Sequence, residues 1–139
     1  MPEGNGATTL VTALRTRPRN TGPTTAVRTL VYARDGHQCV RCGTGSTLTI
    51  QHRTNRAMGG SSDPAINHPT NLVTACQACN MWMEANPAAS YAAGWKVRRP
   101  TDPAHVPVRY PTGELRTLEP DGTSRTLGVP VVITTLARR

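Results

Sequence analysis

The sequence predicts a small α+β domain that depends on a metal site as well as on its hydrophobic core. Two Cys-x2-Cys pairs, Cys39/Cys42 and Cys76/Cys79, are separated by 33 residues. Around them, apolar residues recur at helical spacing in some segments and alternate in others. Only 37% of the 139 residues are hydrophobic, and the chain has no Phe but 12 Gly and 12 Pro. A chain this short and polar buries little apolar surface, so an internal cross-link is expected.

The first predicted element is a helix that begins after Pro23. The apolar residues that follow stand at helical spacing, Thr24 or the next threonine is a suitable N-cap, and Gly36 is suited to end the helix. Arg28 and Arg34 are expected on the outer side of this helix.

Two strands and two further helices are expected around the second cysteine pair. Residues 48–51 alternate apolar and polar side chains, which predicts a strand, and residues 71–75 predict a second extended segment. Cys76 opens a helix that is expected to reach about Glu84. Asn86-Pro87 then predicts a new helix, with Asn as N-cap and Pro at the first helical position.

Composition divides the chain into three parts. Residues 1–22 are rich in Thr, Gly, Pro and Arg and predict a flexible basic arm. Residues 23–95 contain the core elements and the cysteines. Residues 96–139 predict a β-rich C-terminal extension, with a turn at Asp121-Gly122 and β patterns at 106–110, 115–118 and 129–134.

The chain is basic, with 16 Lys and Arg against 8 Asp and Glu and a net charge of +8. All but one of the basic residues are Arg, whose planar guanidinium suits bidentate contact with phosphate. The charge lies toward the two ends, where Arg15, Arg17 and Arg19 are expected to run along a polyanion. Nucleic acid is the common partner of such a chain, although the same charge also fits a surface that binds no partner.

The cysteine spacing predicts a closed structural zinc site. Two knuckles brought together place Cys39, Cys42, Cys76 and Cys79 around one tetrahedral ion. Such a site has no open position and contributes to folding rather than to chemistry. Two disulfides, or four free thiols, are the alternatives; a reducing compartment favours the metal.

The residues between the knuckles resemble the HNH nuclease family. They read Gln51-His52-Arg53, then Gly59-Gly60, then Asn71-Leu72, and end at Cys79-Asn80. The resemblance covers residues 28–84, and the sequence of this stretch is most similar to that of HNH proteins from phages that infect actinobacteria. The resemblance implies a ββα-metal core in which two short strands and one helix converge on a single metal.

The resemblance also implies roles for three residues. His52 would be the general base, since an imidazole can take a proton from water near neutral pH. Asn71 would hold the loop and orient His52 through hydrogen bonds. Asn80 would stand at the motif position that binds the metal.

The chain departs from the family pattern in its metal ligands. The residue before the catalytic His is usually Asp or His, whereas here it is Gln51, and Asn80 is also neutral. Two amides alone bind magnesium weakly, because hard cations prefer carboxylates. Glu84 follows Asn80 by one helical turn and could supply the carboxylate. The alternative is that Glu84 is a solvated helix residue.

Several other side chains have predicted positions. Either Arg53 or Arg56, directly after the base, is expected to clamp the substrate phosphate. Trp82 is expected to pack under the zinc site rather than to stack on a base. His37 and His68 are expected to be loop residues, and the alternative is contact with DNA for His37 and with phosphate for His68. His105 lies in a Pro-rich stretch outside the motif and is assigned no role.

Together these features predict a metal-dependent DNA endonuclease, and the resemblance implies that it leaves 3′-hydroxyl and 5′-phosphate ends. The metal would be magnesium or manganese, and the resemblance implies genome processing beside phage terminase or packaging proteins. One alternative is a DNA-binding module whose weakened metal site no longer cuts, a reading favoured by Gln51 and Asn80. Another is a zinc-stapled assembly protein without DNA affinity.

A cytoplasmic location is expected, which for a phage protein is the host cytoplasm. The first residues lack the charged start and apolar core of a signal peptide. The sequence also has no apolar run of the length that a transmembrane helix needs, so no membrane partner is expected.

Overall fold

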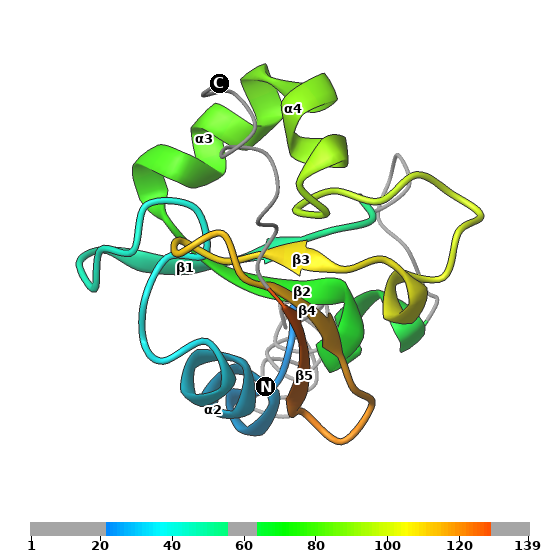
Figure 1. The fold of residues 1–139 in the computed structure, drawn as a ribbon. Coiled ribbons are helices and arrows are strands. Elements are labelled where there is room, and N and C mark those ends of the chain that lie inside the picture. Colours follow the sequence, from blue (N-terminus) through cyan, green and yellow to red (C-terminus); the bar gives the residue numbers. More distant parts are fainter. Residues whose placement is uncertain (1–21, 56–63, 129–139) are drawn as a thin grey trace, which may run out of the picture.

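The computed structural model describes residues 22–55 and 64–128, and within them it is a mixed α+β structure (Figure 1). This confirms the predicted class. The predicted arm 1–22 and Arg56 lie outside the described residues, apart from Gly22. No helix in the described ranges combines the length and apolarity needed to cross a membrane. The elements are α2 (Thr25–Arg34), β1 (Leu48–His52), η1 (Pro64–Asn67), η2 (Pro69–Asn71), β2 (Leu72–Cys76), α3 (Gln77–Ala85), α4 (Pro87–Ala92), η3 (Pro103–His105), β3 (Val108–Arg109), β4 (Leu115–Leu118) and β5 (Ser124–Gly128).

Helix α2 begins and ends as its sequence predicts. The side chain of Thr24 accepts a hydrogen bond from the backbone N–H of Val27, which caps the first turn. Gly36 has a positive φ of 70° just after the last turn. Arg34, expected on the outer side, is instead buried in an ion pair with Asp35, and its side chain is 1% exposed. It donates to two backbone carbonyls at the start of β2, those of Pro69 and Leu72.

Strands β1 and β2 form a two-stranded antiparallel sheet from which α3 continues directly. The register pairs Gln51 with Val73 and His52 with Leu72. All five residues of β2 are buried, whereas most of β1 is only partly covered. The first knuckle is attached to this sheet, because the N–H of Val40 donates to the carbonyl of Thr74. The loop of the first cysteine pair is therefore attached to β2, the strand that ends at Cys76 of the second pair.

The C-terminal part forms a second, three-stranded antiparallel sheet in the order β3-β4-β5. The predicted turn at Asp121-Gly122 joins β4 to β5, and Asp121 caps it by accepting from the N–H of Thr123. The third strand lies at 124–128, ahead of the predicted 129–134, which falls outside the described residues.

One hydrophobic core joins both sheets. It includes Val73 and Met83 from the first half of the chain and Val108 and Leu118 from the second. The β-rich segment predicted as an extension thus packs into the core of the cysteine-bearing part. Gly94 marks the tightest approach, because a Cβ at this position would lie 1.8 Å from the carbonyl oxygen of Pro107.

Candidate metal centre and histidine pocket

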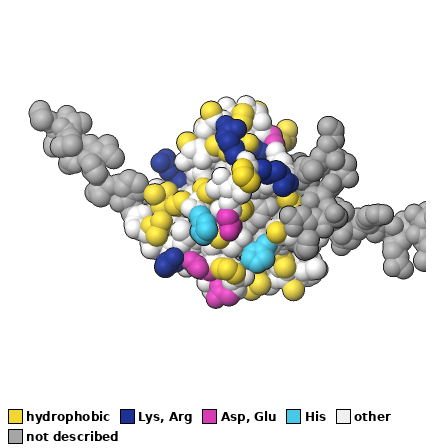
Figure 2. Space-filling model, turned by 90° about the vertical axis from the view of Figure 1, so that its right-hand side faces the viewer, with side chains coloured by type: hydrophobic (Ala, Val, Ile, Leu, Met, Phe, Trp, Pro, Cys, Tyr) yellow, Lys and Arg dark blue, Asp and Glu magenta, His cyan; other side chains and the backbone are white. Residues whose placement is uncertain are grey.

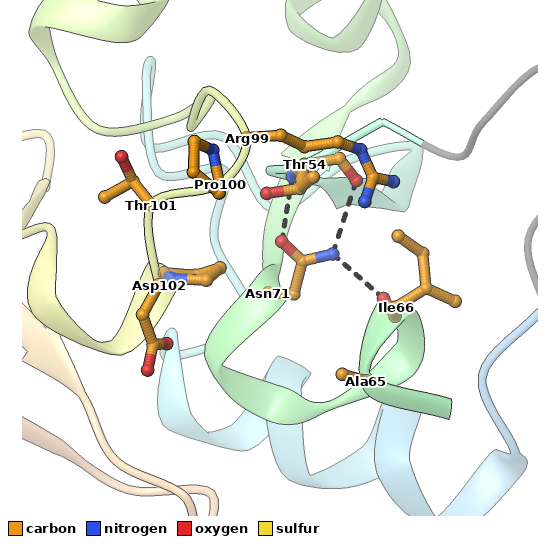
Figure 3. Close-up of a pocket in the computed structure, with 9 residues that line it drawn as sticks. Thr54, Ala65, Ile66, Asn71, Arg99, Pro100, Thr101 and Asp102 are labelled. Carbon is orange, nitrogen blue, oxygen red and sulfur yellow. Dashed lines mark hydrogen bonds between the residues drawn. The ribbon is translucent and has the colours of Figure 1, made fainter. Parts of the chain in front are cut away.

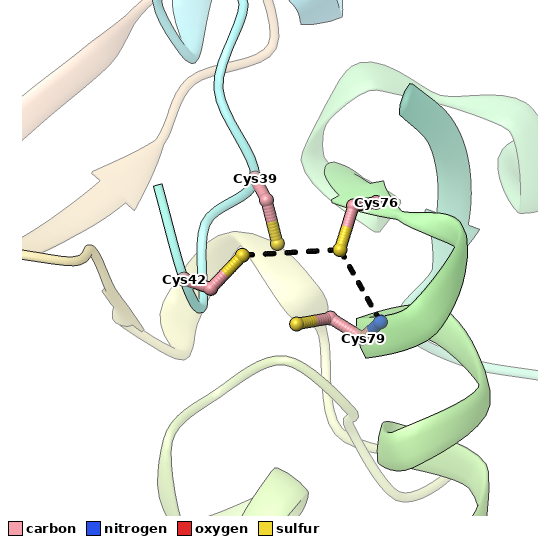
Figure 4. A group of neighbouring side chains, drawn as sticks. All are labelled: Cys39, Cys42, Cys76 and Cys79. Atoms are coloured by element: carbon pink, nitrogen blue, oxygen red, sulfur yellow. Dashed lines mark hydrogen bonds between the residues drawn. The ribbon is translucent and has the colours of Figure 1, made fainter. Parts of the chain in front are cut away.

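The four cysteines meet at one point although they come from two distant segments (Figure 4). Cys39 and Cys42 lie on the loop after α2, Cys76 ends β2, and Cys79 lies in the first turn of α3. All four are free, and their sulfur atoms lie within 4.8 Å of one another. A disulfide would require a sulfur separation of about 2.05 Å. The arrangement could therefore hold a structural metal.

The sulfur spacing fits zinc. A tetrahedral site with zinc–sulfur bonds of about 2.3 Å separates its sulfurs by about 3.8 Å. The Cys42 and Cys76 sulfurs are 3.8 Å apart. Backbone N–H groups also point at the sulfurs, as from Arg41 to Cys39 at 3.4 Å and from Cys79 to Cys76 at 3.3 Å. Donors of this kind stabilise thiolates, which are the metal-binding form of cysteine.

The ionisation of the thiols also favours a shared cation. Burial alone would raise the pKa of Cys39, but backbone donors from Cys42, Cys76 and Arg41 lower it to about 7. Burial and the neighbouring thiols raise the pKa of Cys79 to about 12. Four thiolates this close repel one another, so all four ionise only with a cation between them.

Trp82 packs beside the cysteine cluster, as predicted. It is partly buried against the core, and its ring meets Trp95 edge to face at a centroid distance of 6.3 Å. The Arg41 guanidinium lies 3.6 Å above the Trp82 ring and donates to the Cys79 sulfur at 3.3 Å. These contacts cover part of the tryptophan ring and pack it against the core.

His52 lies at the end of β1 and lines an open pocket together with residues of α3. The pocket is bounded by Ile50, Gln51, His52, Asn55, Asn80 and Glu84. Its walls are the β1 strand and the face of α3 on which Asn80 and Glu84 stand one turn apart. The structure therefore brings together His52 and the three tentative metal ligands named from the sequence.

Asn71 braces the loops next to this pocket but has no hydrogen bond to His52 among the described contacts. Figure 3 shows its side chain bridging two segments: its oxygen accepts from the N–H of Thr54, and its nitrogen donates to the carbonyls of Ile66 and Thr54. Asn67 contacts the imidazole, since its Oδ1 lies 2.8 Å from His52 Nε2. Asn71 thus holds the loop as expected, while Asn67 orients the histidine.

The two amides at the pocket use their nitrogens as donors to protein. Gln51 donates to Glu84 at 3.1 Å, and Asn80 donates to the hydroxyl of Thr49 at 3.0 Å. Within residues 22–55 and 64–128, no donor bonds the amide oxygen of either residue. Amide and carboxylate oxygens are the ligands that hard divalent cations prefer. The donor types therefore fit magnesium or manganese.

Lys96, which the sequence analysis missed, bonds to two of the residues that line the pocket, Asn55 and Glu84. It is 3% exposed, and its ammonium group donates to both carboxylate oxygens of Glu84 at 3.1 and 3.2 Å and to Asn55 at 3.2 Å. Partial burial alone would raise the pKa of Glu84, but the bonds from Gln51 and Lys96 and the charge of Lys96 lower it. Glu84 is therefore an ionised carboxylate held in place. The one feature of the sequence that sets Lys96 apart is that it is the single lysine in a chain with fifteen arginines.

Arg53 does not clamp a phosphate. It is fully buried, and its guanidinium donates to four backbone carbonyls, those of Thr70, Gly94, Pro103 and Val106. Burial and the like charge of Arg34 lower its pKa to about 9, so it is still cationic at neutral pH. Its contacts tie the first sheet to the segment that precedes β3.

We expect Arg53→Met to destabilise the protein by at least about 3 kcal/mol. The substitution leaves four buried carbonyls without their donor, and bonds to charged groups contribute about 1.5–3 kcal/mol each. Urea unfolding measures the effect. Arg125→Met is the matched control, since the Arg125 side chain is 70% exposed and should cost no more than about 0.5 kcal/mol. Equal midpoints for the two variants would contradict this structural role.

The other histidines lie apart from the pocket. His37 and His105 are exposed. His68 caps η2, where its ring nitrogen accepts from the N–H of Thr70. The predictions for Arg15, Arg17, Arg19 and Arg56 concern residues outside the described ranges.

Comparisons with protein-family models, with curated proteins and with solved structures found no match. What this chain does must therefore be inferred from its own residues.

Proposed function

We propose that this chain is a metal-dependent endonuclease that hydrolyses DNA phosphodiesters with His52 as the general base. The observation that carries the proposal is the meeting of His52 and Gln51 from β1 with Asn80 and Glu84 from α3 at one pocket. The order of strand, strand and helix, with one cysteine pair before β1 and the other at the junction of β2 and α3, supports it through the resemblance to HNH nucleases. That resemblance also extends the proposal to phage genome processing beside terminase in the host cytoplasm.

The tautomer of His52 follows from its contact with Asn67. An amide oxygen only accepts, so Nε2 carries the ring proton and Nδ1 is the basic nitrogen. Nδ1 would remove a proton from water as the water oxygen attacks phosphorus. The bond from phosphorus to the 3′ oxygen breaks, and that oxygen takes up a proton. The products are a 3′-hydroxyl and a 5′-phosphate.

Glu84, Gln51 and Asn80 would hold the divalent cation. When bound, magnesium or manganese would stabilise charge on the scissile phosphate. Gln51 and Lys96 hold the Glu84 carboxylate in position at the pocket wall. Lys96 also neutralises part of its charge, so metal binding is expected to be weak.

A DNA-binding module without cleavage is the second candidate. The observation that favours it is the ion pair between Lys96 and Glu84, which occupies the one carboxylate that lines the pocket among the described residues. This candidate predicts DNA binding in the absence of any turnover.

Cleavage of a supercoiled plasmid tests the proposal. Protein with its zinc retained is incubated without added metal, with magnesium or with manganese, and DNA binding is measured on the same sample. Relaxed or linear product that requires the divalent metal is expected. Binding with no product under any condition would favour the second candidate. If the protein neither binds nor cleaves DNA, the remaining candidate is the zinc-stapled assembly protein.

A further inference from the structure

Two arginines that neither the motif nor the proposed mechanism uses lie beside the histidine pocket. Arg98 and Arg99 are exposed on the segment that leaves α4, and they line a second pocket with Asn55 and Tyr91. Asn55 also lines the pocket of His52, so the two pockets share a wall. Figure 2 shows Lys and Arg side chains grouped near histidine and acidic side chains on one face of the molecule.

Both guanidinium groups are held in place without a carboxylate partner. The Arg98 guanidinium lies 3.8 Å above the centre of the Tyr91 ring. Arg99 donates to the backbone carbonyl of Asn55 at 2.7 Å. Within the described part of the chain, neither forms an ion pair, and Figure 3 shows the Arg99 side chain directed away from the carboxylate of Asp102.

Among the described cations, Arg34, Lys96, Arg116 and Arg125 each have an acidic partner within 4.0 Å. The remaining described arginines have no such partner there, namely Arg28, Arg41, Arg53, Arg98, Arg99 and Arg109. Of these six, Arg98 and Arg99 line the pocket that shares Asn55 with the pocket of His52, so their charge is available to an anion bound there. Positioned guanidinium groups lose little side-chain entropy on binding and match the planar geometry of phosphate oxygens.

We infer that the pocket of Asn55, Tyr91, Arg98 and Arg99 binds the DNA backbone at phosphates next to the one that lies over His52. The inference rests on the proposed function, because it takes the substrate of His52 to be DNA. In this arrangement Asn55 is the boundary between the reacting phosphate and its neighbours, and the two arginines set the register of the strand.

Salt-dependent binding of a labelled DNA duplex tests the inference. The variant is Arg98→Gln/Arg99→Gln, and the control is Arg28→Gln/Arg125→Gln. The control removes two exposed charges from α2 and β5, which lie across the molecule from α4 (Figure 1). Each phosphate contact contributes about 0.9 to the slope of log K against log salt, so the variant should lower the slope by about 1.8. At 0.15 M salt this corresponds to about 30-fold weaker binding.

The outcomes separate the inference from the function beneath it. A wild-type slope in the Arg98/Arg99 variant, or an equal loss in the control, would overturn the inference while leaving the nuclease proposal intact. Absence of DNA binding and cleavage by the wild type would overturn both. Thermal unfolding at the wild-type temperature is expected for both variants, since all four side chains are exposed.

Discussion

Removal of one sulfur from the four-cysteine cluster is expected to unfold this protein, because we expect the cluster to hold a structural zinc. Cys42→Ser changes a single exposed sulfur atom and leaves the packing of the core untouched. Structural zinc contributes about 10–16 kcal/mol of apparent binding free energy in small zinc domains. That is comparable to, or exceeds, the roughly 5–15 kcal/mol by which ordinary domains are stable. The variant should therefore lose its zinc together with its cooperative unfolding transition.

The measurement combines zinc content with urea unfolding followed by circular dichroism. Wild type should carry one zinc per chain, and chelator in the presence of reductant should unfold it. Met81→Ala is the control, because Met81 lies on α3 beside Cys79 but is 67% exposed. If zinc-free protein keeps the wild-type urea midpoint, the metal at the cysteine cluster does not stabilise the fold.

His52→Ala is expected to reduce plasmid cleavage by about 100- to 10,000-fold, the range that general-base catalysis contributes. The zinc content and the unfolding midpoint should stay close to those of the wild type, because His52 is only partly buried at the end of β1. His105→Ala is the matched control, since His105 is exposed outside the pocket. It should cleave at the wild-type rate.

The DNA affinity of His52→Ala separates the two candidate functions. If His52→Ala binds DNA as tightly as the wild type but no longer cleaves it, then His52 takes part in the chemistry and other residues bind the DNA. Cleavage that survives in His52→Ala would place the base elsewhere and contradict the proposed mechanism. If only binding is ever observed, the Glu84–Lys96 ion pair is the feature that explains the lost metal.

The elements that the sequence predicted well are those set by local chemistry. A threonine before an apolar helix and a glycine after it define α2, and the alternation of residues 48–51 defines most of β1. The four-cysteine cluster follows from spacing, because a Cys-x2-Cys pair places both sulfurs on one side of a turn. Strand β5 was not predicted, since its largely exposed residues show no apolar alternation, and the predicted segment 129–134 lies outside the described residues.

Only the tertiary structure decided which charged residues lie on the surface and which are buried and hold the fold together. The sequence predicts Arg34 on the outer side of its helix and Arg53 as a candidate phosphate clamp, yet both bond backbone carbonyls far along the chain, as from Arg53 to Val106. Lys96 and Asn67 reach the histidine pocket only when distant segments pack together. The sequence by itself determined the two Cys-x2-Cys pairs, the position of His52 after an alternating strand and the mixed class, because these patterns depend on neighbours within a few residues. The meeting of the two pairs additionally depends on packing, since the loop of the first pair bonds to β2 through Val40 and Thr74. The partners of each buried charge depend on which loops meet, and only the packed chain specifies that.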